Sequence, residues 1–126
     1  MVFIFGGRNQ GKLRYAKQVY GENLTVSDLK VCKLEDALLS DILINIQDAV
    51  KAMLLSGINP SDYFKQNIER FSGKILIGDE IGCGVVPVDA FEREWRDETS
   101  WVYQLLVSKA KRVDRVWAGI GQTLKQ

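Results

Sequence analysis

A short apolar run, followed at once by a glycine-rich turn and a helical pattern, constrains this chain more than any other feature. Residues 2–5 (VFIF) are typical of a buried strand, and residues 11–20 have the pattern of a helix. Between them, GGRNQGK fits the G-x-x-x-x-G-K spacing of a phosphate-binding loop, with Gly6, Gly11 and Lys12 at the fixed positions. Glycines let the backbone turn tightly, so that successive N–H groups face phosphate oxygens at a helix start. The spacing therefore predicts a nucleotide-binding loop.

The hydroxyl position after the lysine is altered. We expect Lys12 to reach the terminal phosphates, whereas Leu13 stands where a Ser or Thr would help to hold Mg²⁺. A second metal-holding position, at the end of the apolar segment 41–46 (DILINI), has Asn45 in place of an acid, with Asp48 a turn further on. The alternative interpretation is an ordinary glycine turn between strand and helix. The expected nucleotide-binding residues are Gly6, Gly7, Arg8, Asn9, Gln10, Gly11, Lys12 and Leu13.

Composition narrows the class of protein. With 126 residues, 46% of them hydrophobic, the chain suits one domain over residues 1–126. Its 17 basic and 16 acidic residues give a net charge of +1, which disfavours a nucleic-acid partner. The apolar opening is too short for a signal peptide, and no run has the length of a membrane span, so we expect a cytoplasmic protein. Cys32 and Cys83 have no metal-binding spacing and the chain has no His, so no metal site is predicted.

Strand and helix patterns alternate along the chain. We expect short strands within residues 24–34, at 41–46, at 74–77 and at 113–118. One helix should begin at Asn59-Pro60 and end at Gly73, and a longer one should begin at Asp89, with an apolar stripe from Phe91 to Leu106. Such alternation predicts an α/β fold of the P-loop NTPase type (RecA-like), a mainly parallel sheet with helices on both faces.

The second half of the chain adds a more specific signal. Residues 78–97 (GDEIGCGVVPVDAFEREWRD), with the ending GIGQTLK, resemble the adenosylcobinamide kinase / adenosylcobinamide-phosphate guanylyltransferase family of cobalamin biosynthesis. That family has an N-E-V-G-x-G-I-V-P signature followed by F-R-D, and its G-G-x-x-S-G-K-S loop is similar to the opening here. The resemblance covers residues 1–20 and 74–126 and, weakly, 28–50. The residues in register are Glu80, Gly82, Gly84, Val86, Pro87, Arg96, Asp97, Gln104, Gly119, Ile120 and Gly121.

The resemblance implies ligands and roles. GTP or ATP would be the nucleotide, accompanied by Mg²⁺, with a cobinamide-like small molecule as second ligand, and the chain would form a homo-oligomer. In a kinase-type reaction, Lys12 would stabilise charge on the phosphates and Glu80 would act as general base or metal ligand. The alternative for Glu80 is a solvated acid in a turn.

The chain also departs from the family. Most of a segment between the first helix and the strand at 41–46 is lacking, and in the family that segment holds a His that becomes guanylylated. Because this chain has no His, we expect no guanylyl transfer through it. Asp79 replaces the usual Asn before the Glu, and residues 100–104 depart from G-x-x-N-Q. Three hypotheses stay open: a non-catalytic nucleotide-binding relative, slightly favoured; a cut-down kinase-type phosphotransferase; and a structural or assembly module that binds no nucleotide.

Overall fold

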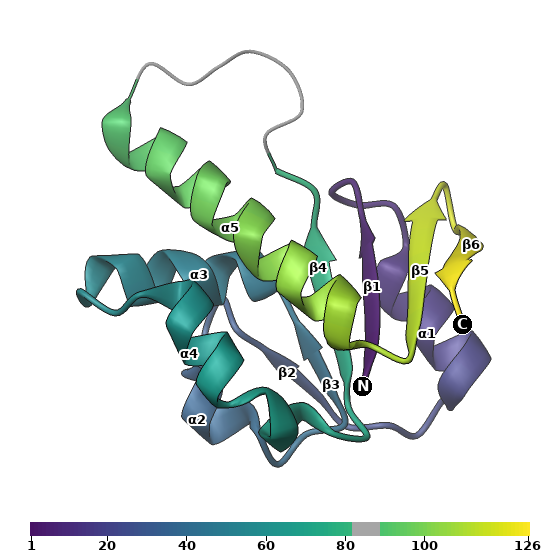
Figure 1. The fold of residues 1–126 in the computed structure, drawn as a ribbon. Coiled ribbons are helices and arrows are strands. Elements are labelled where there is room, and N and C mark those ends of the chain that lie inside the picture. The colour runs from purple at the N-terminus through teal and green to yellow at the C-terminus, as the bar shows by residue number, and fades with distance from the viewer. Residues whose placement is uncertain (82–88) are drawn as a thin grey trace.

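The computed structural model describes residues 1–81 and 89–126, and its centre is a six-stranded sheet in the order β2-β3-β4-β1-β5-β6 (Figure 1). The first five strands run parallel, and β6 runs antiparallel to β5 at one edge. The strands span Val2–Gly6 (β1), Val26–Asp28 (β2), Ile42–Ile44 (β3), Ile75–Asp79 (β4), Arg112–Trp117 (β5) and Ile120–Lys125 (β6).

Helices cover both faces of this sheet. One apolar cluster joins α1 to one face, and a larger one joins the other four helices to the opposite face. The helices span Lys12–Tyr20 (α1), Leu34–Ala37 (α2), Ile46–Leu55 (α3), Pro60–Gln66 (α4) and Ala90–Lys109 (α5). The predicted α/β architecture, a mainly parallel sheet covered on both faces in the P-loop NTPase manner, is confirmed. Within the described residues, no helix combines the length and apolar character needed to cross a membrane.

The strand register brings the predicted loop next to the end of another strand. β1 is buried between β4 and β5, and Gly6 is the partner of Asp79. The backbone N–H of Glu80 donates to the carbonyl of Gly6 over 2.8 Å, which extends the pairing by one residue. Because parallel strands end at one edge of the sheet, the loop after β1 and the residues after β4 share that edge.

Four elements differ from the sequence-based predictions. The chain forms α2 after β2, α3 directly after β3, and β6 after β5, and none of these was predicted. The helix expected to reach Gly73 ends at Gln66 and is followed by a 3₁₀ helix at Ile68–Phe71. At this end the carbonyl of Tyr63 accepts both the backbone N–H of Asn67, over 3.0 Å, and its side-chain Nδ2, over 2.8 Å.

A buried carboxylate anchors α1 to the sheet. Asp114 of β5 is fully buried, and its Oδ2 accepts hydrogen bonds from the hydroxyls of Tyr15 (3.0 Å) and Tyr20 (3.1 Å). Its Oδ1 lies 3.1 Å from Nε of Arg112. Burial, together with the nearby Asp114 charge, raises the pKa of both tyrosines, which keeps them as donors. The helix that begins with Lys12 is thereby fixed in place.

Candidate functional site

The predicted loop joins the end of β1 to the start of α1. Gly6 is required by packing, because a Cβ there would lie 2.3 Å from the carbonyl oxygen of Val116. Asn9 (φ 59°) and Gly11 (φ 85°) adopt left-handed conformations, which turn the chain sharply into the helix. The loop therefore has the tight turn that the glycine spacing predicts.

The loop is tied to the turn between β5 and β6. Gln10 accepts two hydrogen bonds there, one from Ala118 N to its side-chain Oε1 (2.7 Å) and one from Gly119 N to its carbonyl (2.8 Å). The glycine-rich ending that contributes to the family resemblance thus contacts the loop. Because Gln10 is the acceptor in both, these two bonds use none of the loop's own N–H groups.

Backbone donors at the start of α1 have no hydrogen-bond partner among the described residues. Gly11 offers no side-chain cap, so the N–H groups of Lys12, Leu13 and Arg14 are the unpaired first donors of the helix. Within residues 1–81 and 89–126, none of these three groups donates a hydrogen bond, and the first helical bond runs from Tyr15 N to Gly11 O. An anion at this position would accept hydrogen bonds and also interact favourably with the positive end of the helix dipole.

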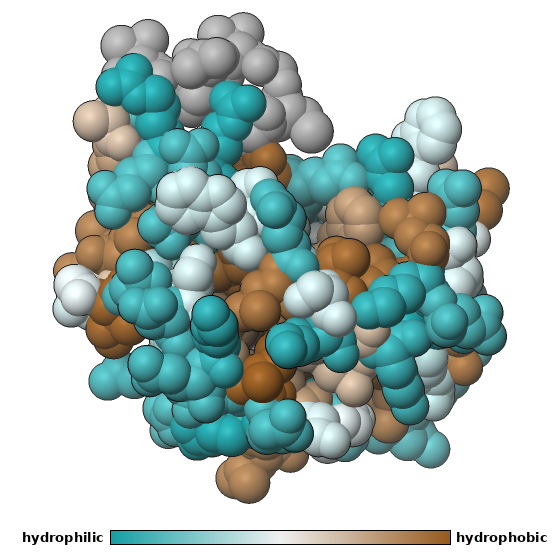
Figure 2. Space-filling model, viewed as in Figure 1, coloured by the Kyte–Doolittle hydropathy of each residue, from teal (hydrophilic) through white to brown (hydrophobic). Residues whose placement is uncertain are grey.

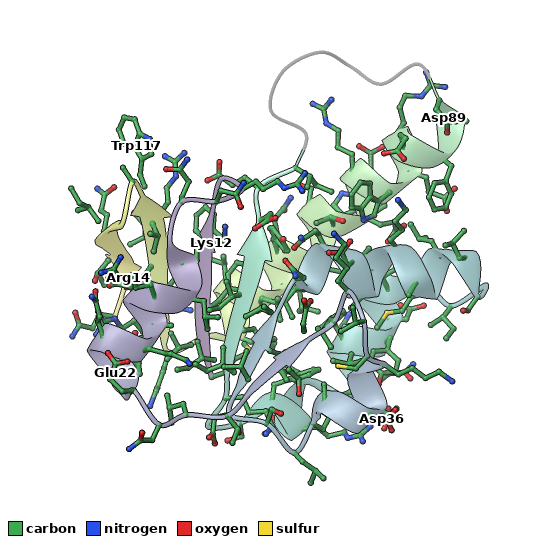
Figure 3. The ribbon with its side chains drawn as sticks, turned by 180° about the vertical axis from the view of Figure 1, so that it is seen from behind. Lys12, Arg14, Glu22, Asp36, Asp89 and Trp117 are labelled. Atoms are coloured by element: carbon green, nitrogen blue, oxygen red, sulfur yellow. The ribbon has the colours of Figure 1, made fainter. Side chains whose placement is uncertain are left out.

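Lys12 points along the strand ends rather than into solvent. Figure 3 shows it at the start of α1, near the ends of β1 and β4. Its ammonium donates to the carbonyl of Gly7 (2.6 Å) and forms an ion pair with Oδ1 of Asp79 (2.7 Å). Only 7% of the Lys12 side chain and 19% of the Asp79 side chain are exposed. The main charge of the loop is thus paired with a carboxylate at the end of β4.

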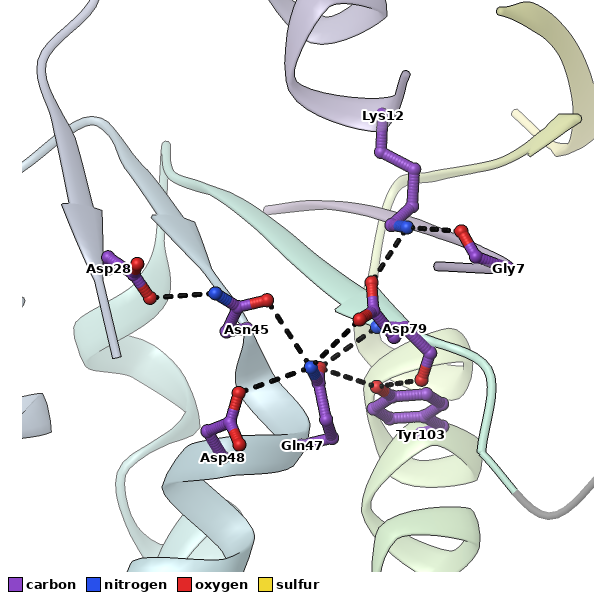
Figure 4. A network of polar contacts seen from close by, with 8 residues as sticks. All are labelled: Gly7, Lys12, Asp28, Asn45, Gln47, Asp48, Asp79 and Tyr103. Atoms are coloured by element: carbon purple, nitrogen blue, oxygen red, sulfur yellow. Dashed lines mark hydrogen bonds and ion pairs between the residues drawn. The ribbon is translucent and has the colours of Figure 1, made fainter. Parts of the chain in front are cut away.

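Gln47 holds the other oxygen of Asp79. Its Nε2 donates to Oδ2 of Asp79 over 3.2 Å, and its Oε1 accepts the Asp79 backbone N–H over 2.9 Å (Figure 4). The same amide nitrogen lies 3.3 Å from both Asn45 Oδ1 and Asp48 Oδ2. Tyr103 of α5 donates its hydroxyl to the carbonyl of Asp79 over 2.7 Å. A polar network therefore connects α1, β4, the start of α3 and α5.

The two altered metal-holding positions lie beside this network. Leu13 and Asn45 line one pocket of about 390 Å³ together with Lys12 and Asp79. Asn45 precedes α3 in a left-handed conformation (φ 65°), and its Nδ2 donates over 2.7 Å to Asp28. Within the described residues, no cluster of three His, Cys, Asp or Glu side chains is arranged to hold a metal ion.

Asp48 is a partly buried carboxylate beside two other acids of this network, Asp28 and Asp79. Partial burial raises its pKa, and the neighbouring charges of Asp79 and Asp28 add to the increase. It lines a second pocket, of about 460 Å³, together with Arg8 and Trp95. This pocket extends from the loop across the ends of β2, β3 and β4.

Glu80, the predicted base or metal ligand, lies at the same edge of the sheet. Its Oε1 is 2.9 Å from Nε of Arg115, and its Oε2 is 3.4 Å from the Nη2 of the same guanidinium. The acid that contacts Lys12 is instead its neighbour, Asp79. Other residues of the predicted signature, namely Gly82, Cys83, Gly84, Val86 and Pro87, lie outside the described residues.

Residues 38–124 match the family described as cobinamide kinase / cobinamide phosphate guanyltransferase. The chain belongs to this family. The resemblance predicted from the second half of the sequence is therefore confirmed, and the protein is a member of a kinase/guanylyltransferase family of cobalamin biosynthesis. Because the match begins at residue 38, Gln47 and Asp79 fall within it and the glycine loop does not.

One curated relative is similar over a shorter stretch. The bifunctional adenosylcobalamin biosynthesis protein CobP of Pseudomonas aeruginosa is 37% identical over 51 residues. These residues are 40% of this chain and 30% of that relative, so the match spans less than a third of the relative's length.

Several members of the network lie outside the predicted site residues. Gln47, Asp28 and Tyr103 were not predicted as site residues, although Gln47 follows the apolar segment 41–46 closely and Asp28 ends β2. The available signal was positional, because polar residues that follow parallel strands collect at one edge of the sheet.

Proposed function

We propose that this protein is a nucleotide-binding member of the cobinamide kinase / guanylyltransferase family that holds a nucleoside di- or triphosphate at residues 6–13. The observation that carries the proposal is the placement of the Lys12 ammonium at a helix start whose first N–H groups have no partner within residues 1–81 and 89–126. Phosphate oxygens are strong acceptors, and they match a buried ammonium group and a set of backbone donors.

Each part of the loop has a defined task in this proposal. Gly6 and Gly11 allow the tight turn, and the N–H groups of the loop and helix start donate to the β-phosphate. Lys12 moves from the carboxylate of Asp79 to the terminal phosphate, so one charge-assisted contact replaces another. Gln47 retains its bonds to Asp79 and stabilises the carboxylate that Lys12 leaves.

The residues present do not fit the Mg²⁺ ion that the family resemblance implies. Leu13 supplies no oxygen, and Asn45 Oδ1 lies 3.3 Å from the donor Nε2 of Gln47. Both Asp79 oxygens already have close partners, Lys12 and Gln47. No reaction step through a metal ion therefore follows, and we propose binding without efficient phosphoryl transfer. A cobinamide-like molecule is the second ligand that family membership suggests.

Titration of the purified chain with GTP and with ATP, each with Mg²⁺ and with chelator, tests the proposal. We expect saturable binding that changes little with Mg²⁺ and no turnover. Turnover that requires Mg²⁺, with a small alcohol as acceptor, would contradict this and favour the kinase-type alternative, in which Glu80 is the base. Absence of any nucleotide binding would favour a structural module.

Covalent chemistry is tested separately. Because the sequence contains no His, incubation with labelled GTP should leave no acid-labile nucleotide on the protein. A labelled, acid-labile protein band would overturn this part of the proposal.

A further inference from the structure

A groove between α5 and β1 lies on the sheet face opposite α1. It has a volume of about 360 Å³, within the range of small-molecule sites. Figure 2 shows hydrophobic surface in the hollow between α5 and the strands beside it. The groove is lined by Phe3, Phe5, Glu80, Ile81, Thr99, Ser100, Tyr103, Gln104 and Val107.

Three aromatic rings form the apolar part of the groove. Phe3 packs against Phe5 with ring centroids 5.7 Å apart and against the edge of Tyr103 at 5.0 Å. The hydroxyl of Tyr103 is directed away from the groove, because it donates to the carbonyl of Asp79. The surface of the groove is therefore formed by the rings and not by the hydroxyl of Tyr103. Such a surface suits a flat apolar group.

A buried hydroxyl that has no partner in the described part of the chain belongs to a residue lining this groove. Thr99 is 1% exposed, and its Oγ1 has no hydrogen-bond partner among the residues that the structure describes. Buried hydroxyls are nearly always hydrogen-bonded, because an unpaired one costs free energy. A ligand that carries a donor or acceptor next to its apolar part would remove this cost.

The mouth of the groove is polar and balanced in charge. Ser100 and Gln104 contact each other over 3.3 Å on α5, and the carboxylate of Glu80 is paired with Arg115. A charged ligand would have to compete with that ion pair, whereas a neutral one would not. Glu80 and Ile81 also line the 460 Å³ pocket at the loop, so the two spaces adjoin.

We propose that this groove is a second ligand site, which takes a neutral, flat, largely apolar molecule bearing a hydroxyl or amide group. The proposal goes beyond nucleotide binding and does not require it, because the groove contains no residue of the loop. The hydroxyl of Thr99 and the rings of Phe5 and Tyr103 are the recognition elements.

Benzyl alcohol and toluene are suitable probes because they differ by one hydroxyl. We expect benzyl alcohol, titrated without nucleotide, to shift the amide NMR signals of Phe5, Thr99, Tyr103 and Gln104 with saturation, and to bind roughly three- to tenfold more tightly than toluene. Thr99→Val should abolish that preference while keeping the apolar contact.

Two further variants test whether the probes bind in the groove even if Thr99→Val does not fold. Ser100→Phe on the exposed wall should block both probes, and Ser108→Phe, on the same helix outside the groove, should not. The proposal would be overturned by equal affinity for the two probes, or by NMR shifts confined to residues outside the groove. It would also be overturned if the NMR signals of groove residues changed with protein concentration and not with benzyl alcohol. The last result would assign the groove to a second copy of the chain.

Discussion

The ammonium group of Lys12 lies 2.7 Å from Oδ1 of Asp79, and this ion pair joins the start of α1 to the end of β4. Both side chains are largely shielded from water, so solvent and salt screen their attraction less than that of an exposed pair. In the absence of a ligand, the Asp79 carboxylate is paired with the Lys12 ammonium, the positive charge on which phosphate binding depends. Ligand and Asp79 therefore compete for Lys12.

Asp79→Asn should strengthen the binding of pyrophosphate measured with chelator present. The amide keeps an acceptor for Gln47 but no longer neutralises Lys12, so affinity should rise roughly tenfold, equivalent to about 1.4 kcal/mol. Calorimetric titration measures the change, and Asp62→Asn on the exposed side of α4 serves as control. Weaker binding in Asp79→Asn would show that the carboxylate contributes to the ligand site instead of competing with the ligand.

Gln47→Ala should destabilise the fold. Gln47 is 5% exposed, and its removal leaves the backbone N–H of Asp79 without its acceptor and opens a cavity. We expect the free energy of unfolding to fall by about 2–4 kcal/mol. Urea unfolding checks this against Gln66→Ala, where the glutamine is exposed. A loss no larger than that of Gln66→Ala would show that the network does not stabilise the strand ends.

Asp48→Asn should stabilise the protein in a pH-dependent way. The pKa of Asp48 is raised in the folded state by burial, so the native state binds this proton more tightly than the unfolded state. Stability is therefore lost as pH rises from the unfolded pKa through the folded one. The variant should gain stability at about pH 7 and match the natural chain at about pH 3.

Urea unfolding at both pH values measures that difference. Asp97→Asn, on an exposed part of α5, should show no comparable gain. A stabilisation of Asp48→Asn that is equal at both pH values would exclude the titration of Asp48 as its cause.

The sequence predicts those parts of the site whose residues lie close together along the chain, and not those that the fold brings together. The loop and Lys12 lie within a few residues of each other, so their spacing alone predicts them. The pairing of Lys12 with Asp79 depends on parallel strands whose order no local pattern specifies. Asp79 and Glu80 are adjacent in the sequence, and the directions of their side chains decide that Asp79 contacts Lys12 and Glu80 contacts Arg115.

The same distinction applies to the fold. The buried strands β1 and β4 are apolar runs, and α5 has an apolar stripe and a cap, since Asp89 accepts from the N–H groups of Phe91 and Glu92. The strand β6 is largely exposed, so its sequence has no apolar pattern. It is a strand because its backbone pairs with β5. The helix α3 begins without a side-chain cap, because Asn45 is directed to Asp28.

Leu13→Ser combined with Asn45→Asp should make nucleotide binding depend on Mg²⁺. Both residues line the pocket that contains Asp79, and Asp tolerates the left-handed conformation of residue 45 as Asn does. Each restored oxygen ligand contributes about 1–3 kcal/mol, so affinity with Mg²⁺ should rise roughly tenfold or more per ligand. The measurement is nucleotide affinity with Mg²⁺ and with chelator.

A matched double variant tests whether the Mg²⁺ dependence comes from positions 13 and 45 or from any Leu→Ser and Asn→Asp change. Leu39→Ser with Asn23→Asp makes the same two chemical changes at exposed positions that line no described pocket at the loop. It should bind nucleotide as the natural chain does. If the repaired chain shows no response to Mg²⁺, the metal-holding geometry is missing for reasons beyond these two side chains.

Nucleotide affinity measured side by side for the natural chain, Lys12→Ala and Lys17→Ala is the most direct test of the central claim. Both lysines lie on α1, but only Lys12 lines the pocket at the loop. Loss of the Lys12 ammonium removes a charge-assisted contact, so affinity for GTP or ATP should fall roughly ten- to a hundredfold or become undetectable. Lys17→Ala should bind as the natural chain does, with both variants folded by circular dichroism. Equal affinities for all three chains would contradict nucleotide binding at residues 6–13.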